Sequence, residues 1–293
     1  MNPGAEEVSP TAGGRKPAPG LYVVATPIGN LEDITVRALR VLATADLVLC
    51  EDTRVTGKLL HHLGTRATAL LPYHEHNAAR VRPQVLARLE AGAVVALVSD
   101  AGTPLVSDPG YKLVREAAGL GIPVVPVPGA SAMLAALCAA GLPTDRFLFQ
   151  GFLPAKPGAR RRALEELAIV PATLVLFESA QRLVIMLAEA AEVLGGRDAA
   201  VARELTKLHE EVRRDRLDRL AEHYAAAGAP KGEVVVVIGP PREAVTPSDE
   251  VVEAALREAL QTEKPRAAAA RVAAATGLPA NELYRRVLAF RGE

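Results

Sequence analysis

The segment with the most chemically useful residues is Ser99–Gly110, which reads SDAGTPLVSDPG. It consists largely of small, turn-forming and acidic residues, and it is longer than the roughly 2–6 residues that usually connect a strand to a helix. Gly102 and Ala101 would let a flat ligand lie against the backbone, and Asp100 could accept hydrogen bonds from hydroxyl or ammonium groups. A purely structural loop is the alternative, but length and composition favour a ligand-binding loop.

Two further segments place polar groups directly after predicted strands. Thr26–Asp33 (TPIGNLED) contains Gly29, which permits close backbone approach, but it is neither the glycine-rich dinucleotide loop nor a Walker loop. A simple turn into a helix is the alternative there. Glu51–Arg54 offers two carboxylates and an arginine that could act on a substrate. The alternative for this segment is a helix N-cap formed by Asp52 or Thr53.

Other segments with polar residues or glycine also flank predicted strands. They are His74–Asn77, Pro128–Ser131, Phe177–Ser179, Ala202–Lys207 and Lys231–Glu233. Ser131 could cap a helix, and Arg203, Glu204 and Lys207 are also compatible with a solvated set of surface charges. The two histidines of His74–Asn77 could bind a metal ion, but no further ligand cluster accompanies them, and we predict no metal site.

A parallel sheet is the arrangement that would bring these segments together. In residues 21–143, short apolar runs alternate with helical patterns, which predicts strands buried on both faces. The predicted strands are Leu21–Ala25, Leu47–Cys50, Val94–Val98 and Val124–Val127. The predicted helices are Thr35–Ala45, a short one ending at Leu59, Asn77–Glu90, Tyr111–Ala118 and Ser131–Ala140. Because ligands bind at the carboxyl ends of such strands, the loops would share one edge of the sheet.

A second α/β unit is predicted after a hinge at Gly141–Thr144, and Ser179 is its candidate helix N-cap. Its predicted elements are the strands Thr173–Phe177, Ala199–Leu205 and Glu233–Ile238 and the helix Gln181–Leu194. Prolines in Gly239–Ser248 predict a linker, and the helices Asp249–Gln261, Arg266–Thr276 and Ala280–Phe290 follow it. The predicted domains are a disordered tail at 1–20, α/β domains at 21–143 and 144–240, and a linker with a helical module at 241–293.

The composition excludes several protein classes. Hydrophobic residues make up 49% of the 293 residues and charged residues 23%, which excludes disorder over the whole length. No apolar stretch is long enough to span a membrane, and the first residues carry no secretory signal. Two cysteines, Cys50 and Cys138, cannot form a disulfide framework or a zinc site. A reducing cytoplasm is the expected location.

The net charge of zero conceals local basic clusters. The last 30 residues hold six cations and two anions, and a second cluster comprises Lys156 and Arg160–Arg162. From the first cluster we predict that the helical module within 241–293 binds RNA, and a small bundle with solvated surface charges is the alternative. Aromatic residues are scarce, with five Phe, five Tyr and no Trp, so a wide base-stacking platform is not expected.

Five motifs taken together resemble one family. They are Tyr22–Thr35 (YVVATPIGNLEDIT), Glu51–Arg54 (EDTR), His74–Asn77 (HEHN), Ser99–Tyr111 (SDAGTPLVSDPGY) and Ala202–Glu211 (ARELTKLHEE). In this order and at these spacings they resemble the bacterial small-subunit (16S) ribosomal RNA (cytidine-2′-O)-methyltransferases, which are tetrapyrrole-methylase-like, class III S-adenosylmethionine enzymes. The resemblance covers essentially residues 20–290. One departure is Phe177–Arg182, which reads FESAQR where the family more often has YESPHR.

The resemblance implies two α/β domains with S-adenosylmethionine in the cleft between them. The residues that it assigns to the cofactor are Pro27, Asp100, Ala101, Gly102, Thr103, Pro104, Ser131, Ala132, Phe177, Glu178, Lys231 and Gly232. It also implies a cytoplasmic homodimer that acts on 16S rRNA or the small ribosomal subunit, with no membrane or DNA partner.

The implied reaction is methylation of the ribose 2′-hydroxyl of a cytidine in the decoding region of 16S rRNA, which needs a base for the hydroxyl proton. The residues considered for catalysis are Asp52, Arg54, Asp100, Glu204 and Lys207, with His74 as a further candidate base and Arg203 as a further phosphate ligand.

Three other functions remain open at this point. A tetrapyrrole or protein-side-chain methyltransferase would use the same cofactor cleft, but the basic helical C-terminus argues against it. A non-enzymatic RNA-binding protein would not need the elaborate loops that follow the strands. A nicotinamide-dependent oxidoreductase would need the glycine fingerprint that is missing here.

Overall fold

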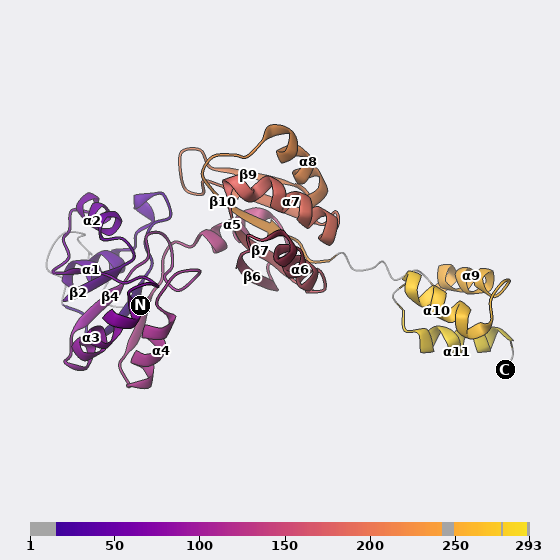
Figure 1. Cartoon of the computed structure of the whole chain (residues 1–293), viewed down its shortest axis with the longest axis horizontal. Helices are drawn as coiled ribbons and strands as arrows, with labels where there is room; N and C mark the ends of the chain where they lie inside the picture. Colours follow the sequence, from indigo (N-terminus) through magenta and orange to yellow (C-terminus); the bar gives the residue numbers. More distant parts are fainter. Residues whose placement is uncertain (1–15, 242–248, 277, 292–293) are drawn as a thin grey trace, which may run out of the picture. The chain divides into compact units, whose positions relative to one another are not determined.

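The chain folds into two compact units, Met1–Pro240 and Pro241–Glu293. The computed structural model describes residues 16–241, 249–276 and 278–291. Most of the predicted tail at 1–20 and most of the predicted linker Gly239–Ser248 lie outside these residues. Each unit is described by itself below, and Figure 1 labels most of the elements of both.

The first sheet of the larger unit is entirely parallel, as the alternating pattern predicts. Its strands are β1 (Gly20–Val24), β2 (Leu47–Cys50), β3 (Leu70–Pro72), β4 (Val94–Leu97) and β5 (Val124–Val127), in the order β3-β2-β4-β1-β5. The edge strand β3 was not predicted, because three residues ending in proline give no clear pattern.

Helices cover both faces of this sheet, which confirms the prediction. They are α1 (Val36–Thr44), α2 (Thr53–His62), α3 (Ala78–Glu90) and α4 (Tyr111–Gly119), with a short 3-10 helix, η1 (Leu31–Asp33), before α1. Residues of α1 and α2 pack with the strand residues Tyr22 and Val24 in one core cluster. Residues of α3 and α4 pack with Leu21 and Leu97 in another.

The second sheet is mixed and contains more elements than the sequence indicated. Its strands are β6 (Phe147–Phe152), β7 (Thr173–Ser179), β8 (Asp198–Arg203), β9 (Glu211–Arg216) and β10 (Glu233–Ile238), in the order β6-β7-β10-β8-β9. Only the β6–β7 pair is parallel. The helices α6 (Pro157–Ala168), α7 (Ala180–Leu194) and α8 (Leu217–Ala227) cover one face. We did not predict β6, β9, α6 and α8.

The other face of the second sheet is covered by α5 (Ala132–Ala140), which follows the last strand of the first sheet. Ala136, Leu137 and Ala140 are buried in one cluster with Val235 and Val237 of β10. The helix therefore begins at the strand ends of one sheet and packs on the other. The predicted boundary after residue 143 lies beyond this helix and stays a prediction.

The smaller unit consists of α9 (Asp249–Ala259), α10 (Pro265–Thr276) and α11 (Ala280–Arg291). The three helices match the predicted ones within two residues at each end. They share a core of their own, formed by Val252, Leu256, Ala259, Ala268, Ala269, Val272, Leu283 and Val287. Among the described residues of the whole chain, no helix is long and apolar enough to cross a membrane.

Candidate functional site

Three of the predicted loops are bonded to one another at the carboxyl ends of the first sheet. Thr26 and Gly102 exchange backbone hydrogen bonds of 2.9 and 3.1 Å, which joins the loop after β1 to the loop after β4. The Thr103 hydroxyl donates to the carbonyl of Ala130 at 3.1 Å, which joins the same loop to the one after β5. The parallel sheet thus places these segments side by side, as expected.

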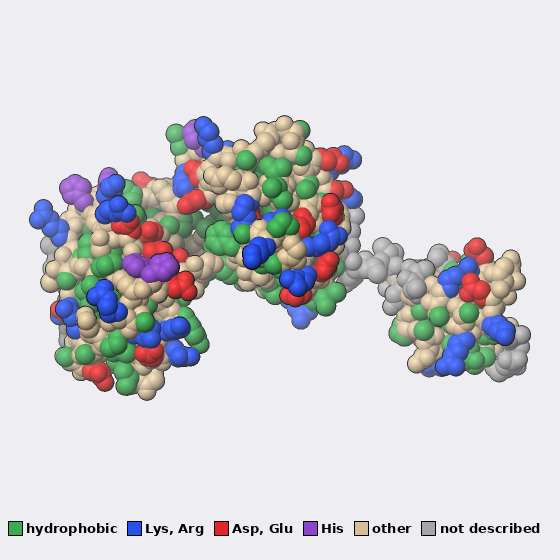
Figure 2. All heavy atoms as spheres, in the orientation of Figure 1, with side chains coloured by type: hydrophobic (Ala, Val, Ile, Leu, Met, Phe, Trp, Pro, Cys, Tyr) green, Lys and Arg blue, Asp and Glu red, His purple; other side chains and the backbone are tan. Residues whose placement is uncertain are grey.

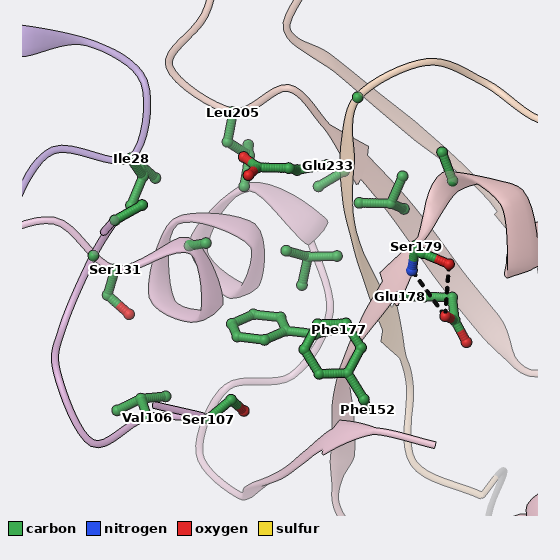
Figure 3. A pocket seen from close by; sticks show the side chains of 18 of the residues that line it. Ile28, Val106, Ser107, Ser131, Phe152, Phe177, Glu178, Ser179, Leu205 and Glu233 are labelled. Carbon is green, nitrogen blue, oxygen red and sulfur yellow. Dashed lines mark hydrogen bonds between the residues drawn. The ribbon is translucent and has the colours of Figure 1, made fainter. Parts of the chain in front are cut away.

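A cavity of about 430 Å³ lies beside these loops and is closed by the second sheet. Figure 3 shows Ile28 and Ser131 on one side of it and Phe177 and Glu178 on the other. Its walls are formed by Ile28, Ala101–Thr103, Val106–Asp108, Ser131, Ala132, Phe152, Phe177–Gln181, Ala202, Leu205 and Gly232–Val235. Its size suits a small-molecule ligand.

The loop after β4 is strained where it lines this cavity. Gly102 has φ +79°, and a Cβ atom there would lie 3.3 Å from Ile28 Cγ2. Two residues with side chains, Leu105 and Ser107, also have positive φ values, 76° and 65°. Such backbone conformations cluster at functional sites, where the surrounding structure holds them in place.

The opposite wall contains a buried carboxylate with unused bonding capacity. Glu178 is 3% exposed, and its Oε1 accepts a 2.8 Å hydrogen bond from the backbone N–H of Ser179. Its Oε2 lies 3.4 Å from Arg182 Nη2 but makes no hydrogen bond within the described part of the chain. Buried carboxylate oxygens normally have hydrogen-bond partners, so this one is available to an ammonium or hydroxyl group of a ligand.

Aromatic rings give the cavity an apolar surface. Phe177 makes edge contacts with Phe149 and Phe152, with ring centroids 4.9 and 5.7 Å apart. Phe152 is 53% exposed and lines the cavity beside Phe177. Together with the glycine-containing loop, these rings suit a flat heterocycle.

A second cavity of about 340 Å³ shares the wall formed by Ile28, Ala101 and Glu233 with the first. Its other lining residues are Pro27, Gly29, Leu31, Val55, Leu59, His62, Asp100 and Lys207. Leu31 and Val55 are 42% and 41% exposed, so apolar surface on this wall remains uncovered. Because the two cavities share Ile28, Ala101 and Glu233, two ligands bound in them would lie next to each other at these residues.

Lys207 is held at this second cavity by two carboxylates. Its Nζ lies 2.8 Å from Glu204 Oε1 and 2.9 Å from Glu233 Oε2. Desolvation opposes the charged form of Lys207, but the hydrogen bonds to Glu204 and Glu233 outweigh it and raise its pKa. A hydrogen bond from Lys207 in turn lowers the pKa of Glu204. The lysine is thus a fixed positive charge, and Glu204 is a poor proton acceptor.

Asp52 has the structural role that was the alternative for its segment. Its Oδ1 accepts from the backbone N–H of Arg54 at 2.8 Å and caps α2, while the Arg54 guanidinium binds both carboxylate oxygens. These hydrogen bonds from Arg54 lower the pKa of Asp52 to about 2. Neither residue lines the two cavities, although the backbone N–H of Asp52 donates to Asp100 Oδ1 at 3.1 Å.

Asp108 has a raised pKa, in contrast to Asp52 and Glu204, whose pKa values are lowered. Burial raises its pKa to about 6, the negative charges of Glu51 and Asp100 add to the effect, and a hydrogen bond from Ser99 opposes it. A carboxyl group with a pKa near neutrality at a cavity wall is a candidate proton acceptor. It belongs to the predicted binding loop, but its burial could not be read from the sequence.

The structure places the predicted cofactor residues around both cavities. Ala101, Gly102, Thr103, Ser131, Ala132, Phe177, Glu178 and Gly232 line the first, and Pro27 and Asp100 line the second. Pro104, which is buried, and Lys231, which is exposed, line neither.

The structure confirms the helix cap at Ser131 and does not confirm the one at Ser179. Ser131 caps α5, with Leu134 N at 3.5 Å from its hydroxyl, whereas Ser179 precedes α7 without a side-chain cap bond. His74 lines neither cavity, and its Nδ1 is buried without a hydrogen bond among the described residues. Within the same residues no group of three His, Cys, Asp or Glu could hold a metal ion.

Several lining residues were missed by the sequence analysis. Ile28 and Val106 lie inside motifs that we had singled out for their polar residues, so their positions within those motifs were the available signal. Phe152 belongs to the unpredicted strand β6, and Gln181 is one of the positions at which the sequence departs from the YESPHR pattern.

Comparisons with known proteins follow the same division of the chain. A family model described as Tetrapyrrole (Corrin/Porphyrin) Methylases matches residues 20–221, and one described as the RsmI C-terminal HTH domain matches residues 246–291. The chain is 55% identical to "Ribosomal RNA small subunit methyltransferase I" of Mesorhizobium japonicum, over 93% of this chain and 92% of that protein. It is 54% identical to the protein of the same name from Erythrobacter litoralis, over 94% and 96%.

One solved structure adds a ligand to this comparison. Uroporphyrin-III C-methyl transferase from Thermus thermophilus, complexed with S-adenyl homocysteine, is 26% identical and aligns with a TM-score of 0.51, covering 75% of this chain and 97% of that one.

Proposed function

This chain belongs to the tetrapyrrole methylase family and, within it, to the ribosomal RNA small subunit methyltransferase I proteins, and from that premise we propose that it transfers a methyl group from S-adenosylmethionine to RNA of the small ribosomal subunit. The observation that carries this proposal is the pair of adjoining cavities at the strand ends, one suited to the cofactor and one beside it.

The residues of the first cavity fit S-adenosylmethionine. Phe152 and Phe177 offer apolar ring surface for an adenine ring, and Gly102 allows a ligand to lie against the backbone. Glu178 Oε2, which makes no hydrogen bond within the described residues, suits a hydroxyl or ammonium group. When bound, the cofactor supplies a methyl group activated by the positive charge of the sulfonium.

The protein's own task in such a displacement is to align the acceptor and exclude water. The two cavities adjoin at Ile28, Ala101 and Glu233, and these residues would fix the line along which the methyl group passes. In the transfer the carbon–sulfur bond breaks, a carbon–oxygen bond forms, and the acceptor hydroxyl loses its proton to the protein.

We assign that proton to Asp100 and Asp108 acting as a pair. Asp52 and Glu204 are hydrogen-bonded to cations that lower their pKa, which makes them poor acceptors. Asp100 lines the second cavity, Asp108 lines the first, and the charge of Asp100 contributes to the raised pKa of Asp108. Each carboxylate borders one of the two adjoining cavities, so both residues are named as proton acceptors.

The experiment that tests the function combines cofactor binding with product mapping. The protein is incubated with labelled S-adenosylmethionine and small subunits from cells that lack the enzyme, and the labelled nucleotide is located. Calorimetry that detects no cofactor binding, or label found only in protein, would contradict the proposal.

The finer substrate assignment is the ribose 2′-hydroxyl of a cytidine in the decoding region of 16S rRNA. Its support is the motif resemblance from Tyr22 to Glu211, together with a transfer site that offers carboxylates to a hydroxyl group. A 2′-O-methylated linkage resists alkaline hydrolysis, because the internal nucleophile is blocked, and mass spectrometry places the methyl group on the sugar. A methyl group on the base would reject this assignment.

The same resemblance supports two further proposals, that the protein acts as a homodimer and that it acts in the cytoplasm. Sedimentation equilibrium tests the first, and fractionation of cells with antibody detection tests the second. A monomer at every concentration, or protein recovered only outside the cytoplasm, would contradict them.

A further inference from the structure

The loop Glu204–Glu210, between β8 and β9, presents an apolar side chain to solvent beside the second cavity. Leu208 at its tip is 92% exposed. Leu205 in the same loop is 8% exposed and packs in the core with α5, and Lys207 lines the cavity. Within four residues the loop therefore directs Leu205 into the core, Lys207 to the cavity and Leu208 into the solvent.

This loop is braced and strained rather than loosely connected. Glu204 and Thr206 have φ values of 50° and 66°, although neither is glycine. Thr206 N donates to Glu210 Oε2 at 2.6 Å, and Lys207 N donates to the Glu204 carbonyl at 3.0 Å. Single exposed leucines are common on protein surfaces. Here, however, the surrounding bonds keep Leu208 at a fixed place next to a ligand site, at the expense of unfavourable backbone angles.

Lys207 also connects this loop to the first sheet. A Cβ atom on Gly29 would lie 2.4 Å from Lys207 Cγ, so the lysine stem lies directly on the loop after β1. The second cavity is thus bordered by the loop after β1, by α2, by Asp100 and by Lys207. A nucleotide that leaves the stack of its neighbours would bring its ribose to the residues that this cavity shares with the first.

The second cavity has the chemistry of a nucleoside site. Leu31, Val55 and Leu59 form an apolar surface for a base, while Asp100 and the remaining N–H of Lys207 can bind hydroxyl groups. His62 Nδ1 lies 2.8 Å from the Lys58 carbonyl oxygen, which can only accept, so Nδ1 is the donor and Nε2 is the other polar atom of the ring. A polar edge therefore lies beside the apolar surface.

We propose that the second cavity receives the acceptor nucleoside after it has left its stack, and that Leu208 enters the RNA in its place. This inference rests on the proposed function. Apolar side chains inserted between bases stabilise unstacked nucleic acid in other complexes. The strain in the loop serves to hold Leu208 and Lys207 in fixed positions, one replacing the nucleoside and the other binding it.

The first test compares Leu208→Ala with Ile169→Ala, which removes an aliphatic side chain that is 84% exposed and lines neither cavity. With unmethylated small subunits as substrate, Leu208→Ala should lower kcat/KM by about tenfold or more, in keeping with the cost of unstacking. Ile169→Ala should leave kcat/KM unchanged, and calorimetry should give the same cofactor affinity for both variants.

The second test reports on unstacking directly. A short oligonucleotide with 2-aminopurine next to the acceptor cytidine is bound in the presence of S-adenosylhomocysteine, and its fluorescence rises when the neighbouring base unstacks. Leu208→Ala should reduce the rise at saturating protein. Val55→Trp, which fills the second cavity from α2, should abolish the rise and the methylation while cofactor affinity stays unchanged.

The outcomes separate the inference from the function. A Leu208→Ala variant with wild-type kcat/KM and wild-type fluorescence would overturn the role of the loop, and an active Val55→Trp variant would overturn the role of the cavity. A wild-type protein that binds the cofactor but methylates no RNA would instead contradict the proposed function.

Discussion

At the scale of single residues, the structure changes how the cofactor loop should be tested. Substituting Gly102 combines two effects, because φ is +79° there and a Cβ atom would press on Ile28. A loss of binding in such a variant could therefore reflect a distorted loop. Ala101 lies in the same loop, is exposed and lines both cavities without a positive φ value.

We therefore predict that Ala101→Arg abolishes cofactor binding by filling the cavity, with a thermal midpoint within about 2 °C of wild type because surface substitutions change stability little. Gly102→Arg should also abolish binding but lower the midpoint. Calorimetry and thermal unfolding of both variants decide this. Undiminished affinity in Ala101→Arg would remove this loop from the cofactor site.

A second prediction at this scale concerns Asp108, whose pKa is raised to about 6. Its carboxylate favours a sulfonium cation, so cofactor affinity should fall as pH drops through about 6, and Asp108→Asn should remove this dependence. Calorimetry between pH 5 and pH 7.5 measures it. A wild-type affinity that is flat over this range would exclude Asp108 from the site.

Asp108 should also make folding stability depend on pH, but here stability should fall as pH rises, whereas cofactor affinity should rise with pH. Because the folded-state pKa is raised, the contribution of Asp108 to stability is present below its unfolded pKa and is lost as pH rises through about 6. Asp108→Asn should therefore stabilise the protein at pH 7, by about 1 kcal/mol after a discount for partial exposure. Denaturant unfolding at pH 5 and pH 7 checks this, and equal stability changes at both values would contradict it.

At the scale of elements, the sequence predicts the strands that form apolar runs and misses those that do not. Val94–Leu97 and Glu233–Ile238 are uninterrupted apolar runs or nearly so, and both form central strands. The edge strand β9 reads EVRRDR, so its charges hide it, and β6 is interrupted by Gly151 at a register shift. The cavities combine loops from both sheets, and periodicity carries no information about such long-range contacts.

Helix α6, which was not predicted, changes the interpretation of the basic cluster at Lys156 and Arg160–Arg162. Arg160 was expected in a local basic cluster, but it is 5% exposed, and its Nε lies 2.5 Å from Glu189 Oε2 of α7. Arg161 pairs with Glu165 and Glu192. Figure 2 shows basic and acidic side chains side by side over this part of the molecule. Two of the four cations in this cluster are thus paired with carboxylates, and these pairs join two helices.

We predict that Glu189→Ala destabilises the protein by about 3–5 kcal/mol, because it leaves the buried Arg160 without its partner. The variant in which both residues are replaced, Arg160→Met with Glu189→Leu, should be much closer to wild type. Urea unfolding of the two variants provides the measurement. Equal losses in both would show that packing and not the lone charge dominates.

At the scale of the whole molecule, the C-terminal unit supplies cations whose roles differ. Arg286 lies 2.5 Å from Asp249 and 2.7 Å from Glu282, so it ties α11 to α9. Arg285 and Arg266 are exposed and make no salt bridge within the described residues. The paired arginine is therefore structural, and the two others are the candidates for phosphate contacts.

We predict that Arg285→Ala combined with Arg266→Ala weakens RNA binding. The slope of log K against log salt concentration should fall by about two, because two fewer phosphate contacts release counterions on binding. Cofactor affinity should stay unchanged, since neither residue lines the cavities. Arg286→Ala serves as the comparison and should lower stability instead. An unchanged salt slope in the double variant would leave these arginines as solvated surface charges.

Helix α5 has a consequence for what counts as an independent piece of this protein. It follows β5 of the first sheet, yet its apolar face covers the second, where Arg214 also binds the carbonyl of Ala139. A fragment ending near residue 143 would carry an apolar helix with nothing to cover, and a fragment starting there would expose one whole face of its sheet to water. Neither half is then a self-sufficient folding unit. Proteolytic cleavage at this point would give two fragments that persist only by reassociating, and a recombined protein made by exchanging halves between relatives would have to exchange α5 with the second sheet.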